Sequence, residues 1–159
     1  MKSIVSIIVV VFVVFACREQ GTKNAVAIPK VISLAIADTF LLKRLDTMYT
    51  SAVSIDTADR VFVTAEDEAR LSERWIEFHN QFASYLRSKD LHSEKMGQTF
   101  ITLYCSKNGS VDHASYAFID PIDSLTERRY TYHLEEFIRN HGLDIVASKP
   151  YSQCGSVKY

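Results

Sequence analysis

The sequence has no concentration of basic residues and no strong excess of either charge. Its 18 lysines and arginines are scattered along the chain and are balanced by 19 aspartates and glutamates, which gives a net charge of −1. Nucleic-acid-binding proteins gather lysine and arginine on one segment or face, because the phosphate backbone has to be neutralised. The charge pattern therefore argues against a nucleic-acid partner.

Enzyme motifs are also missing. The chain contains no nucleophile elbow, phosphate-binding loop, zinc-protease helix or EF-hand loop. The nearest approach to a catalytic set is Cys105, Asp112 and His113, but Cys105 and His113 would point to opposite faces of a hairpin. His133 and His141 lie two helical turns apart, which is too wide for two ligands of one metal ion. The sequence predicts no catalytic residue, no metal site and no cofactor.

No apolar run is long enough to span a bilayer, which requires about 20 residues. The longest extends from Ile4 to Phe15, interrupted by Ser6, with Lys2 before it and Ala16 after it. A basic start, a short apolar run and a small residue are typical of a secretory signal. We expect residues 1–16 to be a signal peptide and the rest of the chain to be exported.

The residues Val14-Phe15-Ala16-Cys17 resemble the lipobox of bacterial lipoproteins, in which the cysteine thiol is lipidated and the signal is cut just before it. The resemblance implies that Cys17 is the mature N-terminus, that acyl chains such as palmitate anchor it, and that residues 17–30 form a tether. The absence of aspartate after Cys17 favours an outer membrane, with the domain facing the periplasm. The alternative is a plain secretory signal cut after Ala16 or a little later, which leaves a soluble secreted or periplasmic protein.

Three cysteines are present, and lipidation of Cys17 leaves Cys105 and Cys154. Export favours a disulfide between these two, with a stabilisation of roughly 4 kcal/mol in the chain-entropy model. Simple alternation in the last strand conflicts with this pairing, so we predict a β-bulge at Gly155 that returns Cys154 to the face of Cys105. The alternative is a reactive thiol, for which the chain lacks both a Cys-x-x-Cys pair and a neighbouring cationic cluster.

The clearest predicted helix covers residues 64–88. Thr64 and Asp67 approximate a capping box, and acidic residues crowd the first turn. The helix carries an apolar stripe with a spacing of three and four residues: Leu71, Trp75, Phe78, Phe82 and Tyr85. Such a stripe could line a ligand groove, but we interpret it as a face that packs on a sheet.

Two further helices are predicted. One extends from Ser33, as N-cap, to about Ala52. The other starts at the box formed by Ser124 and Glu127 and ends at Gly142. Its inward-facing residues are Tyr130, Leu134, Phe137 and Ile138.

Between these helices the hydrophobic period changes to two, on both sides of Asn108-Gly109. This dipeptide is a strong signal for a type I′ hairpin turn. Counting outward from the turn pairs Lys107 with Ser110, Cys105 with Asp112, Leu103 with Ala114, and Ile101 with Tyr116. The predicted core face is Ile101, Leu103, Cys105, Ala114, Tyr116 and Phe118. Tyr104 and His113 meet on the other face and form a candidate partner-binding surface.

The order hairpin, helix, strand in the last sixty or so residues resembles the C-terminal domain of TonB and related periplasmic modules. The residues that carry the resemblance are the NGSV turn, the DSLTE helix start and a closing strand after KPY. It implies a small sheet whose edge strand accepts a partner segment. We therefore expect residues 31–159 to form a single α+β domain, with a small antiparallel sheet packed against one or two helices.

These features favour an envelope lipoprotein that acts as a protein- or peptide-binding or scaffold module, with an unidentified envelope protein or peptide as partner. A periplasmic immunity or inhibitor protein is an alternative, because small size and lipid anchoring also suit that role. An unrecognised enzyme is a third, and a deep polar pocket with converging titratable groups would favour it.

Overall fold

The computed structural model describes residues 28–54, 59–91 and 96–159. The predicted signal peptide, Cys17 and most of the predicted tether lie outside these residues. Within them the chain forms, in order, β1 (Val31–Ser33), α1 (Thr39–Met48), β2 (Thr50–Ser51), α2 (Ala65–Ser88), β3 (Gln98–Cys105), β4 (Val111–Phe118), α4 (Ser124–Ile138) and β5 (Tyr151–Lys158).

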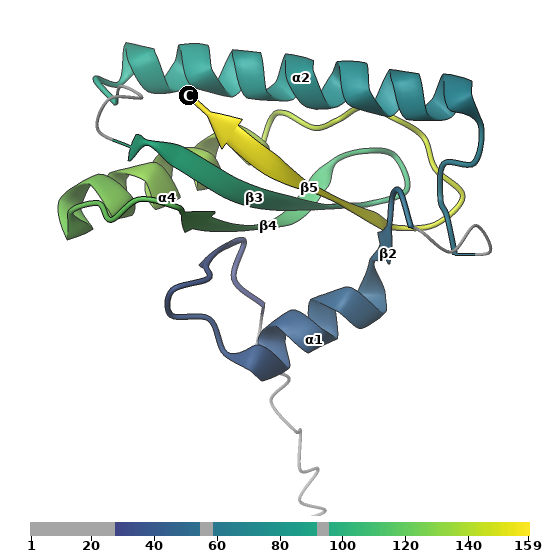
Figure 1. Cartoon of the computed structure of the whole chain (residues 1–159), viewed down its shortest axis with the longest axis horizontal. Helices are drawn as coiled ribbons and strands as arrows, with labels where there is room; N and C mark the ends of the chain where they lie inside the picture. Colours follow the sequence, from purple (N-terminus) through teal and green to yellow (C-terminus); the bar gives the residue numbers. More distant parts are fainter. Residues whose placement is uncertain (1–27, 55–58, 92–95) are drawn as a thin grey trace, which may run out of the picture.

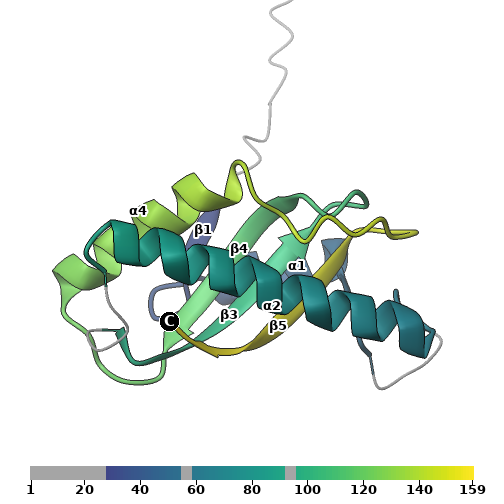
Figure 2. The same cartoon turned by 90° about the horizontal axis from the view of Figure 1, so that it is seen from above.

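The strands form one mixed sheet in the order β1-β4-β3-β5-β2. The three long central strands are antiparallel, as the sequence predicts, whereas β1 and β2 pair in parallel with β4 and β5. Helices α2 and α4 cover one face of the sheet, and α1 lies on the other (Figure 1). Viewed from above, α2 crosses over β3 and β5 while α4 lies over the side of β1 and β4 (Figure 2). The α+β class is confirmed, but the purely antiparallel sheet is wrong at both edges.

The segment predicted as one helix from Ser33 to Ala52 contains three elements. Ser33 ends β1, and α1 is capped by Asp38, whose carboxylate accepts a 2.9 Å hydrogen bond from the Phe40 amide. The chain then returns to the sheet as β2, where the Ala52 amide donates to the Ser152 carbonyl at 2.8 Å. Strands of two or three residues are too short to show an alternating pattern, so only their long-range pairing reveals them.

Helix α2 follows the prediction closely. Thr64 is its N-cap, and the threonine hydroxyl accepts a 3.0 Å hydrogen bond from the Asp67 amide. Leu71, Phe78 and Phe82 are buried in the core that α2 shares with the sheet and α4. Trp75 and Tyr85 are partly buried and pack against the same core. The apolar stripe therefore packs on the sheet, as expected from its width.

Helix α4 begins one residue earlier than predicted. Its N-cap is Asp123 instead of Ser124, because the Asp123 carboxylate accepts hydrogen bonds from the amides of both Leu125 and Thr126. It ends at Ile138, short of the predicted Gly142. The predicted inward face is confirmed, since the four residues are buried: Tyr130, Leu134, Phe137 and Ile138.

The hairpin keeps the predicted register away from its turn, with Ile101 opposite Tyr116, Leu103 opposite Ala114, and Tyr104 opposite His113. The turn itself differs. The Ser106 amide donates to the Ser110 carbonyl, and within the described residues Asn108 has no positive φ while Gly109 has a φ of 85°. The loop thus has three residues, Lys107 to Gly109, as in a type I turn followed by a left-handed glycine.

A second irregularity compensates for the longer loop. Between Tyr104 and Cys105 the register shifts, so that Cys105 pairs with Val111 and not with Asp112 as predicted.

Gly109 is required at the turn, because a Cβ there would lie 2.5 Å from the backbone nitrogen of Ile145. The predicted core face is confirmed: Ile101, Leu103, Cys105, Ala114 and Tyr116 are buried and Phe118 packs against them.

Candidate functional site

Strand β5 has an open outer edge. Strand β2 pairs only with Tyr151 and Ser152, so from Gln153 to Lys158 no described residue pairs with the outer side of β5. Figure 2 shows β5 at the rim of the three long strands. Natural sheets usually shorten, cover or charge their edges, because unpaired backbone groups attract another strand. An uncovered stretch of this length is therefore a candidate docking edge.

The direction of the hydrogen bonds identifies which backbone groups are available. The Thr50 amide donates to the Pro150 carbonyl and the Ala52 amide to the Ser152 carbonyl, so even-numbered residues of this segment face outward. Backbone groups alternate between the two sides of a strand. Cys154, Ser156 and Lys158 consequently present their N–H and C=O groups to the open edge, while the residues between them bond to β3.

A groove of about 260 Å³ lies between this edge and α2. One wall consists of Trp75, Ile76 and Asn80 of α2, and the other is the end of β5 from Ser156 onward. Ile76 is 59% exposed, so its side chain is accessible to a docked segment. An apolar side chain of a docked segment could contact both Trp75 and Ile76 here.

Gly155 places the indole of Trp75 at the groove. A Cβ on Gly155 would lie 3.2 Å from Cζ2 of Trp75, so the indole ring packs directly against the backbone of β5 at this glycine. A glycine inside a strand often marks such a close approach. The pairing of β5 with β3 continues regularly through Gly155 opposite Ile101, so the predicted bulge at this position is wrong.

His79 lies beneath the groove and is 7% exposed. Burial lowers its pKa to about 3, so the imidazole is neutral and carries one proton. Nδ1 of His79 lies 2.9 Å from the Tyr159 hydroxyl, which also accepts a longer hydrogen bond from the Tyr130 hydroxyl. The other ring nitrogen, Nε2, is buried and has no hydrogen-bond partner among the described residues. The floor of the groove therefore contains a buried polar nitrogen without a partner, and leaving such a group unpaired costs about 1–3 kcal/mol.

The predicted surface at Tyr104 and His113 is not a free surface. Tyr104 is buried in a second apolar cluster with Ile32, Leu45 and Tyr49, and its ring lies 5.4 Å from that of Tyr49. His113 is half-buried, and its Nδ1 lies 2.8 Å from the Pro29 carbonyl. This prediction is wrong, because α1 and the residues before β1 cover that part of the sheet.

The predicted disulfide is absent from the structure, where Cys105 and Cys154 are both free. Cys105 pairs with Tyr151 whereas Cys154 pairs with Thr102, so the regular register sends the two side chains to opposite faces. Cys105 is buried, which raises its pKa to about 12 and keeps the thiol protonated. Cys105 is accordingly not a nucleophile, and Cys154 is an exposed thiol beside the open edge.

The histidines of α4 and its C-terminal end have structural contacts. His133 packs against the Tyr85 ring, and His141 stacks on Phe137 with ring centroids 3.9 Å apart. In the part of the chain that the structure describes, no group of three His, Cys, Asp or Glu side chains could hold a metal ion. Across the same ranges, no helix is long and apolar enough to cross a bilayer.

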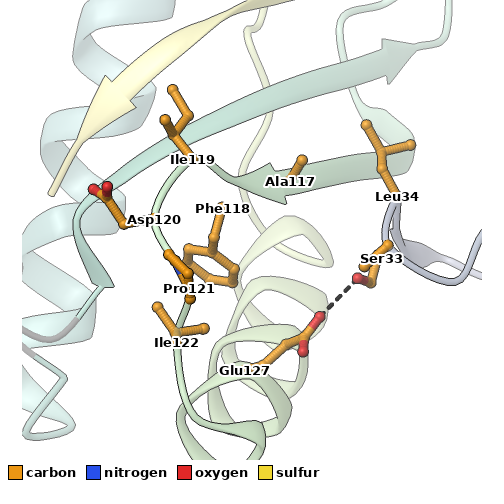
Figure 3. A pocket seen from close by; sticks show the side chains of 10 residues that line it. Ser33, Leu34, Ala117, Phe118, Ile119, Asp120, Pro121, Ile122 and Glu127 are labelled. Carbon is orange, nitrogen blue, oxygen red and sulfur yellow. Dashed lines mark hydrogen bonds between the residues drawn. The ribbon is translucent and has the colours of Figure 1, made fainter.

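A second recess, of about 420 Å³, lies where β1 ends beside β4 (Figure 3). Its wall includes Glu127, which accepts a 2.7 Å hydrogen bond from the Ser33 hydroxyl and a longer one from the Tyr116 hydroxyl. Strand β1 already pairs with β4 up to Tyr116. The recess therefore offers a shorter stretch of free strand than the edge of β5.

Two residues on which the groove depends, Trp75 and Gly155, stand out in the sequence, but the sequence pattern predicted other roles for them. The spacing of Trp75 predicts a place in the packing stripe, and Gly155 predicts a bulge.

Comparisons of the chain with models of protein families, with curated proteins and with solved structures found no match. The open edge and the groove are thus the features from which a function can be inferred.

Proposed function

We propose that this protein is a membrane-anchored binding module that takes up an extended segment of another envelope protein as an additional strand along β5. The open edge from Gln153 to Lys158, with the groove beside it, is the observation that carries the proposal. Strand addition supplies affinity through main-chain hydrogen bonds, and pockets for alternate side chains supply specificity. Here the three outward-facing residues Cys154, Ser156 and Lys158 offer the main-chain groups.

The groove supports selectivity for an apolar side chain. In an added strand, every second side chain points toward α2, where Trp75 and Ile76 flank the groove. The preferred segment is therefore extended and carries an apolar side chain opposite the groove.

The second part of the proposal is the anchor. Cys17 is lipidated and holds the domain at a membrane, with the outer membrane and a periplasmic orientation as the favoured location. The lipobox-like residues Val14 to Cys17 support this. Lipid anchoring keeps the module close to envelope proteins and raises their effective concentration.

Site-specific photocrosslinking in intact cell envelopes tests this function. A photoreactive amino acid in place of Ile76, in the full chain, is expected to crosslink one dominant envelope protein through a single extended segment. A synthetic peptide of that segment should then bind the purified protein. The identity of the partner also separates a scaffold from an inhibitor, because an inhibitor would capture a toxin or a hydrolase.

The matched control carries the same group in place of Val146, which is also exposed but lies between α4 and β5, outside the groove. Val146 should give no dominant product. Equal crosslinking from both positions, or a peptide that fails to bind the purified protein, would contradict strand addition. A Cys17→Ala chain that crosslinks as efficiently as the anchored one would contradict the role of the anchor.

A further inference from the structure

Two of the most exposed apolar side chains of the described residues lie four positions apart at the tip where α1 starts. Ile36 is 87% exposed and Phe40 is 73% exposed, and Asp38 between them is the helix cap. Single exposed apolar residues are ordinary, but two bulky ones on one tip are unusual for a surface that meets only water.

The opposite side of the same tip packs on the domain. Ala37 and Leu41 pack against the second apolar cluster, which also contacts Ile28, the first residue that the structure describes. These contacts fix the position of the tip and leave Ile36 and Phe40 exposed on it. Ile36 also stands beside a groove of about 500 Å³ that Tyr116 and Thr131 line. The chain that leads back to Cys17 leaves the domain beside this tip.

The length of that chain limits how far the tip can be from a membrane. Residues 18–27 connect Cys17 to Ile28. Ten residues span at most about 35 Å when fully extended, and about 17 Å on average as a flexible linker. A lipidated Cys17 would thus hold the start of α1 at the membrane surface at a high effective concentration.

We propose that Ile36 and Phe40 insert into the interfacial layer of the bilayer and orient the domain on the membrane. This inference rests on the lipid anchor of the proposed function. Because α1 and α2 lie on opposite faces of the sheet, α1 then faces the lipid and α2 faces away from it (Figure 1). The groove beside α2 is consequently presented to the periplasm, where another protein can reach it.

The contact is apolar and not electrostatic. Along α1 and its cap, Asp38 and Asp46 balance Lys43 and Arg44, so this region has no net charge to attract anionic lipids. Polybasic segments are released from membranes by salt, whereas burial of apolar side chains is not. We expect the orientation to persist at high salt.

Fluorescence quenching by lipid tests the inference on the full, lipidated chain. With Cys154→Ser to remove the exposed thiol, single cysteines replace Ile36, Phe40 or the control Val146, and each is labelled with a fluorophore. The proteins are reconstituted in vesicles of phosphatidylethanolamine and phosphatidylglycerol that contain a spin-labelled lipid. Probes at positions 36 and 40 should be quenched at least threefold more than the probe at 146, with and without high salt.

Flotation of the same samples separates the two possible failures. Protein that floats with the vesicles, with equal quenching at all three positions, retains its anchor and overturns the orientation. Protein that does not float has no working anchor, and the orientation falls together with that part of the proposed function. As a second measure of orientation, Phe40→Asp should abolish the quenching difference at position 36 while the protein still floats.

Discussion

Replacing Ser156 with proline is expected to weaken binding of the added strand by about 10- to 100-fold while the domain stays folded. The Ser156 amide faces the open edge, so the substitution removes a donor for the incoming strand and no bond to β3. Proline is tolerated on the solvent side of an edge strand for this reason. Titration of wild type and S156P with the synthetic peptide of the crosslinked segment measures the loss of affinity. Thermal unfolding of both proteins measures whether the domain stays folded.

Two further variants make this result specific. Ser156→Ala keeps the amide and should bind like wild type. Val157→Pro removes an amide that bonds to β3 and should destabilise the sheet by about 1–3 kcal/mol, because its partner carbonyl is left unpaired. If S156P binds the peptide as well as wild type does, the segment docks elsewhere.

Lowering the pH from 7 to about 4 is expected to reduce the free energy of unfolding of wild type by about 3 kcal/mol more than that of His79→Gln. Burial lowers the pKa of His79 to about 3 in the folded protein, whereas its ordinary value is 6.5. The unfolded chain therefore binds the extra proton first as the pH falls. The stability linked to His79 is complete above pH 6.5 and is lost progressively down to about pH 3.

Urea unfolding at a series of pH values measures this difference. Gln is chosen because its amide oxygen can accept the hydrogen bond from the Tyr159 hydroxyl. His79→Phe, which keeps a ring beside Trp75, serves as a second non-titrating variant. Parallel stability curves for wild type and both variants would show that His79 takes up its proton at the same pH in the folded and unfolded chains, which would contradict its burial as a neutral side chain.

Local signals predicted much of the architecture. The capping hydroxyl of Thr64 and the apolar period of α2 depend on neighbours in sequence, so they can be recognised without the fold. The pairing of Ile101 with Tyr116 was predicted even though the turn is one residue longer, because the register shift after Tyr104 cancels the added residue. Counting outward from the turn therefore gave the correct pairs beyond Tyr104, although it missed both the extra loop residue and the register shift.

Long-range relations account for what sequence reasoning missed. The pattern of α1 shows that one of its faces is buried, but it does not show which face of which sheet receives it. For that reason Tyr104 and His113 were predicted to be exposed although α1 and Pro29 cover them. The predicted disulfide required a bulge at Gly155, and the regular pairing of Gly155 with Ile101 instead keeps the two thiols on opposite faces.

The candidate site was predictable in kind but not in place. The resemblance at the sequence level suggested that an edge strand accepts a partner, but not which edge is free. That depends on β2 ending at Ser51, which leaves the rest of β5 unpaired within the described ranges. The groove in turn depends on Gly155 allowing Trp75 to rest on the strand.

Amide hydrogen exchange in β5, with and without the crosslinked peptide, tests the central claim most directly. Strand addition predicts that exchange slows at Cys154, Ser156 and Lys158, whose amides face the open edge, and changes little at Gly155 and Val157, which already bond to β3. Slowed exchange in β1 or α1 with no change at the three outward amides would contradict docking along β5.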